Sequence, residues 1–239
     1  SEEDEVLKTL DRKHKEAKKE LDKVLRELEE EHKKVKRELD EVLKRLEDIH
    51  RRITELLRRG GISLEDVLRM VKEANRELVE VIKRIVKTVE DLNARAVEVV
   101  KRLAEELERL NAEMVKVLRK SGRSEEIEKD LRRSSADIRR LVEEIERRLR
   151  DSLRKLRKLA DDLAKKLKES LDKLEELVRR GVDEEAVERV LKENKELIEE
   201  IVRLIRKILD ENIELIRRIV RLLERLLREN LRLIEEARK

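Results

Sequence analysis

The chain contains three histidines, His14, His32 and His50, which lie eighteen residues apart. Eighteen residues make about five turns of α-helix, so one straight helix would carry all three rings on a single face. An imidazole can donate or accept a hydrogen bond, titrate near neutral pH or bind a metal ion. The chemistry of the three rings therefore depends on which side chains they contact and on which elements position them.

Three later segments repeat the same spacing with uncharged polar residues. In chain order these are Asn75, Asn93 and Asn111; Ser134, Ser152 and Ser170; and Asn194, Asn212 and Asn230. Apolar residues share the period, as in Val187, Ile205 and Leu223. A heptad repeat would impose a left-handed supercoil, whereas a repeat of eighteen matches 3.6 residues per turn, so we expect nearly straight helices.

The composition is typical of long helices with an aliphatic core. Charged residues make up 52% of the 239 residues and hydrophobic residues 38%, and the chain has no Phe, Tyr, Trp, Pro or Cys. Leu, Ile and Val recur with helical spacing, so apolar burial can offset the entropy of ordering the chain. Lysine and arginine nearly balance aspartate and glutamate, with a net charge of +4, which is typical of a solvated mixed-charge surface.

Glycines occur at three points only and predict three short loops. Gly60-Gly61, Gly122 and Gly181 each precede a helix N-cap signal, at Ser63, Ser124 and Asp183. The predicted helices are residues 2–59, 64–120, 125–180 and 184–238. Short loops make consecutive helices antiparallel neighbours, so the sequence predicts an all-α fold, a single-chain up-down-up-down four-helix bundle forming one domain over residues 1–239.

The twelve polar residues fall into three layers of this predicted bundle. In two antiparallel neighbouring helices, the numbers of facing residues have a constant sum. The polar residues follow this rule for each pair of consecutive helices, and half of each sum is a residue number within the loop that joins the two helices. The layers are His14, Asn111, Ser134 and Asn230; His32, Asn93, Ser152 and Asn212; and His50, Asn75, Ser170 and Asn194. Neighbouring layers would be about 27 Å apart.

Helical-wheel positions direct these residues into the core. Asn194 falls within the apolar arc that contains Ile198 and Leu209, and His14 falls beside Leu7 and Leu21. A buried polar group without a hydrogen bond costs about 1–3 kcal/mol. Since His, Asn and Ser each offer a donor and an acceptor, a layer can close as a connected network. We expect the layers to specify helix pairing and register, because misalignment would place them against apolar side chains.

A pH-responsive bundle is the alternative prediction. Burial disfavours the charged imidazole, so the pKa of a buried histidine should fall below about 6.5. Stability would then be present above the unfolded pKa and would be lost as the pH falls. Protonation would also turn the acceptor nitrogen into a donor and break the network.

Catalysis and metal binding are not expected. A nucleophilic serine needs an oxyanion hole, and packed helices offer no free backbone N–H groups at mid-helix. One histidine per layer is a poor zinc site, and Asp11 and Glu47, three residues before His14 and His50, fall outside the apolar stripe. We therefore predict no enzyme activity, no cofactor and no metal.

Partners and targeting are likewise not indicated. Without aromatic residues or a one-sided basic face, we expect no nucleic-acid binding. The longest uncharged run, Gly60 to Leu64, is far too short to span a membrane, and no signal peptide is expected. A monomer is favoured over a homo-oligomer. Self-association is a further alternative, because some apolar residues lie at the edges of their stripes: Val81, Val99, Val117, Leu204, Ile213, Leu222 and Leu231.

The twelve polar residues, the glycine-serine loops and the eighteen-residue period resemble computationally designed helical bundles with buried hydrogen-bond networks. This resemblance covers the whole chain. It implies a structural scaffold with no natural biochemical activity or natural localisation, made by recombinant expression in the cytoplasm. Some members of that class have histidine networks and come apart in acid, but they are typically oligomers of short hairpins, whereas here one chain carries all four helices.

Overall fold

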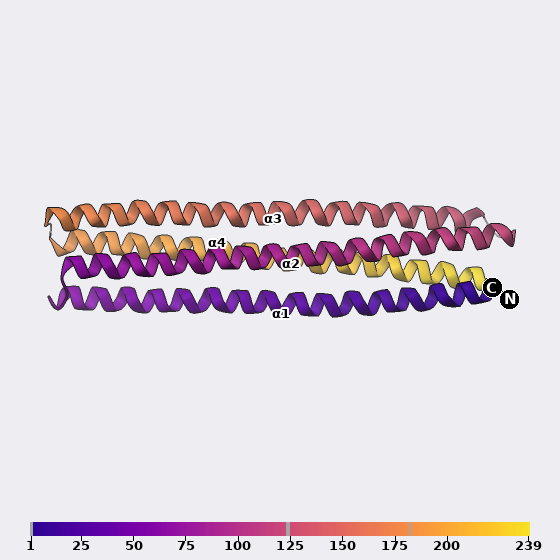
Figure 1. Ribbon diagram of the computed structural model, residues 1–239, viewed down its shortest axis with the longest axis horizontal. Coiled ribbons are helices and arrows are strands. Elements are labelled where there is room, and N and C mark those ends of the chain that lie inside the picture. Colours follow the sequence, from indigo (N-terminus) through magenta and orange to yellow (C-terminus); the bar gives the residue numbers. More distant parts are fainter. Residues whose placement is uncertain (1, 123–124, 182) are drawn as a thin grey trace. The chain divides into compact units, whose positions relative to one another are not determined.

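The computed structural model describes residues 2–122, 125–181 and 183–239, and within these ranges the protein is all-α. The four helices are α1 (Glu2–Arg58), α2 (Leu64–Lys120), α3 (Glu125–Arg180) and α4 (Glu184–Arg238) (Figure 1). The predicted fold class, a four-helix bundle, is confirmed. Three helices have the predicted bounds, and α1 ends one residue earlier than predicted.

The end of α1 follows from the backbone of its first glycine. Gly60 has a φ of 68°, a conformation that residues with a Cβ rarely adopt. Its N–H donates to the Leu57 carbonyl at 3.2 Å, and the Gly61 N–H donates to the Leu56 carbonyl at 2.9 Å. These two bonds form a Schellman motif, which satisfies the last carbonyls and stops the helix at Arg58.

Two of the predicted N-caps have the expected hydrogen bonds. The Asp66 N–H donates to Ser63 Oγ at 3.1 Å, and the Ala186 N–H donates to Asp183 Oδ1 at 3.0 Å. Each bond satisfies one of the free N–H groups in the first turn. The third predicted cap, Ser124, lies outside the described residues.

The contacts divide the chain into two compact units, each with one segment of every helix. Unit 1 comprises Ser1–Glu31, Asp91–Asp151 and Asn212–Lys239, and unit 2 comprises His32–Glu90 and Ser152–Glu211. A single domain over the whole chain stays a prediction.

In unit 1, ion pairs and hydrogen bonds join consecutive helices. Arg102 of α2 pairs with Glu20 of α1, and Arg139 of α3 with Glu108 of α2 at 2.7 Å. The ring closes through α1 and α4, where Arg217 Nε lies 3.4 Å from Glu29 Oε1. One apolar cluster, which includes Leu21, Leu103, Ile145 and Leu223, fills the interior.

Unit 2 has the same helix order. Arg84 of α2 pairs with Glu38 of α1, Arg157 of α3 with Glu90 of α2, and Arg58 of α1 with Glu188 of α4. Its apolar core consists of two clusters. One contains Leu39, Ile82, Leu163 and Ile205, and the other contains Ile53, Val67, Leu174 and Val187. The third predicted layer falls between the residue ranges of these two clusters.

Within each unit, α2 and α4 are the more deeply buried helices. Among the described residues they contribute more buried apolar side chains than α1 and α3 do. They also meet across the centre, because side chains of α2 and α4 bond to each other directly. The asparagines of the predicted layers therefore lie on the two helices that meet in the middle.

Candidate functional site

The buried polar residues form the candidate site. In the described part of the chain they are His14, His32, Asn75, Asn93, Asn111, Ser134, Asn194, Asn212 and Asn230. All of them belong to the twelve residues singled out by spacing. The remaining three, His50, Ser152 and Ser170, are half-buried.

In the first layer, Asn230 of α4 is the hub of a connected network. Its Nδ2 donates to Asn111 Oδ1 at 2.8 Å and lies 3.2 Å from His14 Nε2. Its Oδ1 accepts from the Ser134 hydroxyl at 2.7 Å. Side chains of all four helices are thereby linked around an amide that is 0% exposed.

The proton positions of this network follow from one backbone contact. His14 Nδ1 lies 2.7 Å from the Leu10 carbonyl, which can only accept, so Nδ1 carries the proton. In the neutral ring Nε2 is then an acceptor, and its neighbour must be the Asn230 amide nitrogen rather than its oxygen. This fixes the amide orientation and leaves the Asn230 oxygen for Ser134. The network is therefore complementary only while His14 is neutral.

A fifth residue, Ser135, takes part and was not anticipated. Asn111 Nδ2 donates to Ser135 Oγ at 3.0 Å. The positions one repeat further along are Leu153 and Leu171, so a serine here breaks the apolar repeat. That break was the available signal.

The third layer, in unit 2, contains an asparagine pair. Asn75 and Asn194 each donate from Nδ2 to the other's Oδ1, both at 3.2 Å. Within the described chain, neither the His50 ring nor the Ser170 hydroxyl makes a hydrogen bond. The reciprocal amide bonds satisfy the two asparagines without the histidine or the serine, so the described chain shows an asparagine pair in this layer and not a network of four residues.

His50 instead lies beside a small cavity in unit 2. The cavity has a volume of about 30 Å³ and is lined by apolar residues together with six polar or charged ones: Glu47, His50, Asn75, Asn194, Lys195 and Glu199. A water needs about 10–15 Å³ and two to four polar partners, both of which this cavity provides. Because charged side chains of α4 border the ring, His50 is a partly solvated group and not a core residue.

The second layer contributes residues to both units. In unit 1, Asn93 and Asn212 form a reciprocal pair with N···O distances of 3.1 and 2.8 Å. In unit 2, His32 is buried and Ser152 is half-buried. The α2–α4 asparagine pair is therefore common to all three layers, whereas the roles of histidine and serine vary.

Burial lowers the pKa of His14 below the ordinary value of 6.5, against opposing effects of the Leu10 carbonyl, Asp11 and Glu106. Burial also lowers the pKa of His50, with Lys195 acting in the same direction and Glu199 against it. Both rings therefore favour the neutral form.

In the first layer the described geometry does not pair a serine nucleophile with a base. The Ser134 hydroxyl donates to Asn230 and not to His14, so no base is positioned to take its proton. In the described residues no group of three His, Cys, Asp or Glu side chains could hold a metal ion, and no helix is long and apolar enough to cross a membrane.

Comparison with known proteins finds no matching family model, no matching curated protein and no matching solved structure. What the fold and the site define is a class of architecture, a four-helix bundle with buried histidine, asparagine and serine hydrogen bonds.

Proposed function

We propose that this protein is a designed structural scaffold without catalytic activity, in which buried polar layers specify how the helices pair. The observation that carries the proposal is that every buried polar residue in the described chain belongs to the eighteen-residue repeat. The repeat and the absence of aromatic residues support a designed origin, since such a core is the kind recommended for designed packing.

The asparagine pairs supply the register between α2 and α4. Each pair joins residues 119 positions apart, so the helices run parallel in a fixed alignment. Sliding α4 by one turn in unit 1 would place Asn111 against Leu226 or Ile234. Each amide left unpaired costs about 1–3 kcal/mol, so two pairs in unit 1 disfavour the slipped alignment by several kcal/mol.

The test removes the amides and measures the alignment. All six asparagines of the pairs are replaced by leucine, and spin labels at Glu98→Cys and Glu235→Cys, which are separated by about 27 Å along the helix direction, report the α2–α4 alignment in unit 1. We expect one narrow distance in the parent chain. In the leucine variant a second population should appear, displaced by about 4–5 Å, because the labels are separated mainly along the helix direction and one turn rises about 5.4 Å.

His50→Leu in the same labelled background is the matched control, because its ring makes no hydrogen bond in the described chain. The control should keep the single distance. A single unchanged distance in the six-leucine variant would show that apolar packing alone sets the register.

A second candidate function, acid-triggered loosening, is supported by the His14 network. His14 accepts from Asn230, and a protonated ring would present a donor to that same N–H. The folded pKa is lowered, so this contribution to stability is present above pH 6.5 and is lost as the pH falls below it. Unfolding by denaturant at pH 8 and pH 5, in the parent and in His14→Gln, tests this. If the variant and the parent lose equal stability, the histidine is not a switch.

We further propose that the scaffold is monomeric and binds neither nucleic acid nor membranes. Most edge residues of the apolar stripes are buried or half-buried, and Leu204, at 41%, is the exposed large apolar side chain of the described residues. A single such side chain is a normal feature of monomer surfaces. Light scattering at two concentrations should give one molar mass, and a rise with concentration would contradict the proposal.

A further inference from the structure

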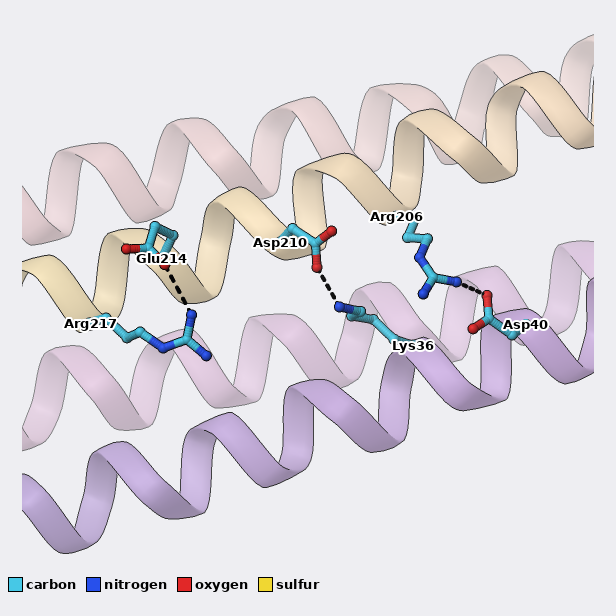
Figure 2. Close-up of polar contacts among 6 residues, drawn as sticks. All are labelled: Lys36, Asp40, Arg206, Asp210, Glu214 and Arg217. Carbon is cyan, nitrogen blue, oxygen red and sulfur yellow. Dashed lines mark hydrogen bonds and ion pairs between the residues drawn. The ribbon is translucent and has the colours of Figure 1, made fainter.

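Ion pairs fix the alignment of α1 and α4. In unit 2, Lys36 Nζ lies 2.5 Å from Asp210 Oδ1, and Asp40 pairs with Arg206 one turn away, as Figure 2 shows. Moving four residues toward the C-terminus of α1 corresponds to moving four residues toward the N-terminus of α4, as antiparallel helices require. The same numerical alignment holds in unit 1, where Glu29 pairs with Arg217.

The positions of this ion-pair cluster recur in unit 1 after one eighteen-residue repeat, but there the charges on α4 are reversed. On α1 the equivalent residues are Lys18 and Asp22, with unchanged charges. On α4 the residues equivalent to Arg206 and Asp210 are Glu224 and Arg228. In unit 1, therefore, Asp22 is level with Glu224 and Lys18 is level with Arg228, so both pairs carry like charges.

The two like-charged pairs differ in burial. Lys18 and Arg228 are exposed, and their repulsion is screened by water. Asp22 and Glu224 are half-buried, and Glu224 Oε1 is shielded from solvent without a hydrogen-bond partner in the described part of the chain. Two partly desolvated carboxylates at one level cannot both be charged without a cost, and a proton on one of them removes that cost.

The surroundings of Glu224 also favour the protonated form of its carboxyl. Burial first, and then the hydrogen bond and charge of Asp22, raise the pKa of Glu224 to about 7, although Lys18 and Arg228 act to lower it. The charges that act on it come from α1 and from α4 itself. Arg26, a further cation on α1, donates to the Asp22 backbone carbonyl rather than to its carboxylate.

We propose that Asp22 and Glu224 form an acid pair that holds one proton between α1 and α4, and that this pair stabilises unit 1 as the pH falls below neutrality. The protonated Glu224 carboxyl donates to the Asp22 carboxylate. Its folded pKa lies above the unfolded value of 4.5, so the stabilisation is fully present below about pH 4.5 and is lost as the pH rises through about 7.

The acid pair gives the scaffold a second pH-dependent site, and its response is opposite to that of His14. As the pH falls below 6.5, the acid pair gains stability, whereas the network around His14 loses it. Unit 1 therefore contains two titrating sites of opposite sign, and the net pH dependence of the chain should be shallower than the histidine alone would give.

The direct test is a carbon-13 NMR titration of the Glu224 side-chain carboxyl in the full chain. We expect a midpoint near 7. In Asp22→Asn the midpoint should fall by about one unit or more, since the neighbouring negative charge is removed. A midpoint near 4.5 in the parent chain, or a midpoint near 7 that Asp22→Asn leaves unchanged, would overturn the pairing.

A stability measurement uses the charge order of unit 2 as a template. Glu224→Arg combined with Arg228→Asp reproduces the arrangement of Arg206 and Asp210. We expect this variant to exceed the parent in folding equilibrium constant at pH 8 by about tenfold, the equivalent of one pKa unit for a partly solvated pair. The advantage should shrink at pH 5.5, where the parent holds its proton.

The reciprocal change in unit 2 is the matched control. Arg206→Glu combined with Asp210→Arg should lower stability at pH 8 and recover part of it at pH 5.5. Both comparisons retain His14, so its titration cancels in the differences. If the unit 1 variant differs from the parent by the same amount at both pH values, no shared proton contributes and the proposal is wrong.

Discussion

Asn230→Leu should be among the most destabilising single substitutions in the chain. The Asn230 side chain makes three hydrogen bonds and is 0% exposed. Its removal leaves His14 Nε2, Asn111 Oδ1 and the Ser134 hydroxyl without their partner. Because the Ser134 hydroxyl can rotate to another acceptor, two groups stay unsatisfied, and at about 1–3 kcal/mol each the gross loss is about 2–6 kcal/mol.

Asn194→Leu is the reference for this prediction. Asn194 bonds only to Asn75 among the described residues, so its loss leaves both the donor and the acceptor of one amide unpaired. That amide borders the cavity beside His50, where water can replace the lost bonds, so we expect a loss of about 1–3 kcal/mol. The leucine adds a similar apolar gain at both positions and cancels in the comparison. We therefore expect Asn230→Leu to destabilise the protein by about 1–3 kcal/mol more than Asn194→Leu.

The assay is urea unfolding at pH 8, where the histidines are neutral, followed by circular dichroism. Equal slopes with denaturant in both variants would show that the same surface unfolds. If the two variants lose equal stability, Asn230 is not the centre of a network and the hydrogen-bond assignment is wrong.

Three further predictions follow from the same structure. His14→Leu should destabilise the protein at pH 8 by about 1–3 kcal/mol because it strips a partner from Asn230, whereas His50→Leu should be neutral or stabilising, as thermal unfolding can show. Gly60→Ala should cost about 1–2 kcal/mol by equilibrium unfolding because φ is 68°, whereas Gly61→Ala should be nearly neutral, since its added Cβ would meet Leu56 at an ordinary 3.6 Å. Finally, the His14 imidazole should titrate below 6.5 in proton NMR, and a midpoint at or above that value would contradict its burial.

The sequence was sufficient for the helices because their ends depend on local chemistry. A glycine with positive φ and a serine or aspartate cap act within a few residues, so Gly60, Ser63 and Asp183 mark the boundaries without knowledge of the fold. The level of each polar residue was likewise accessible, because loop midpoints and the helical rise are fixed quantities.

The partners within a layer could not be predicted in the same way. A helical wheel gives the direction of a Cα–Cβ bond, whereas a hydrogen bond depends on side-chain rotamers and on helix rotation at the scale of a few tenths of an ångström. His14 and His50 share a wheel position, yet one is 1% exposed and bonded and the other is half-buried beside a cavity. Neither the role of Ser135 nor the burial of Glu224 follows from periodicity, since both depart from the repeat.

We expect Ser135 to account for the difference between the first and third layers, and this can be tested. In the first layer Asn111 donates to Ser135, so it does not donate back to Asn230. The Asn230 oxygen then accepts from the Ser134 hydroxyl alone, whereas in a reciprocal amide pair it would also have to accept from Asn111. Where leucine stands at the equivalent positions, 153 and 171, the asparagines pair reciprocally.

Ser135→Leu should therefore turn the first layer into a reciprocal Asn111–Asn230 pair and release Ser134 and His14. The nitrogen-15 chemical shift of His14 Nε2 should then move toward the value of a ring whose Nε2 accepts no hydrogen bond, as at His50. Overall stability should change little, because the leucine adds buried apolar area. Ser135→Ala is the control that removes the hydroxyl without adding that area, and it should give the same nitrogen shift at lower stability. An unchanged His14 signal in both variants would show that the open form of the network is set by backbone placement and not by Ser135.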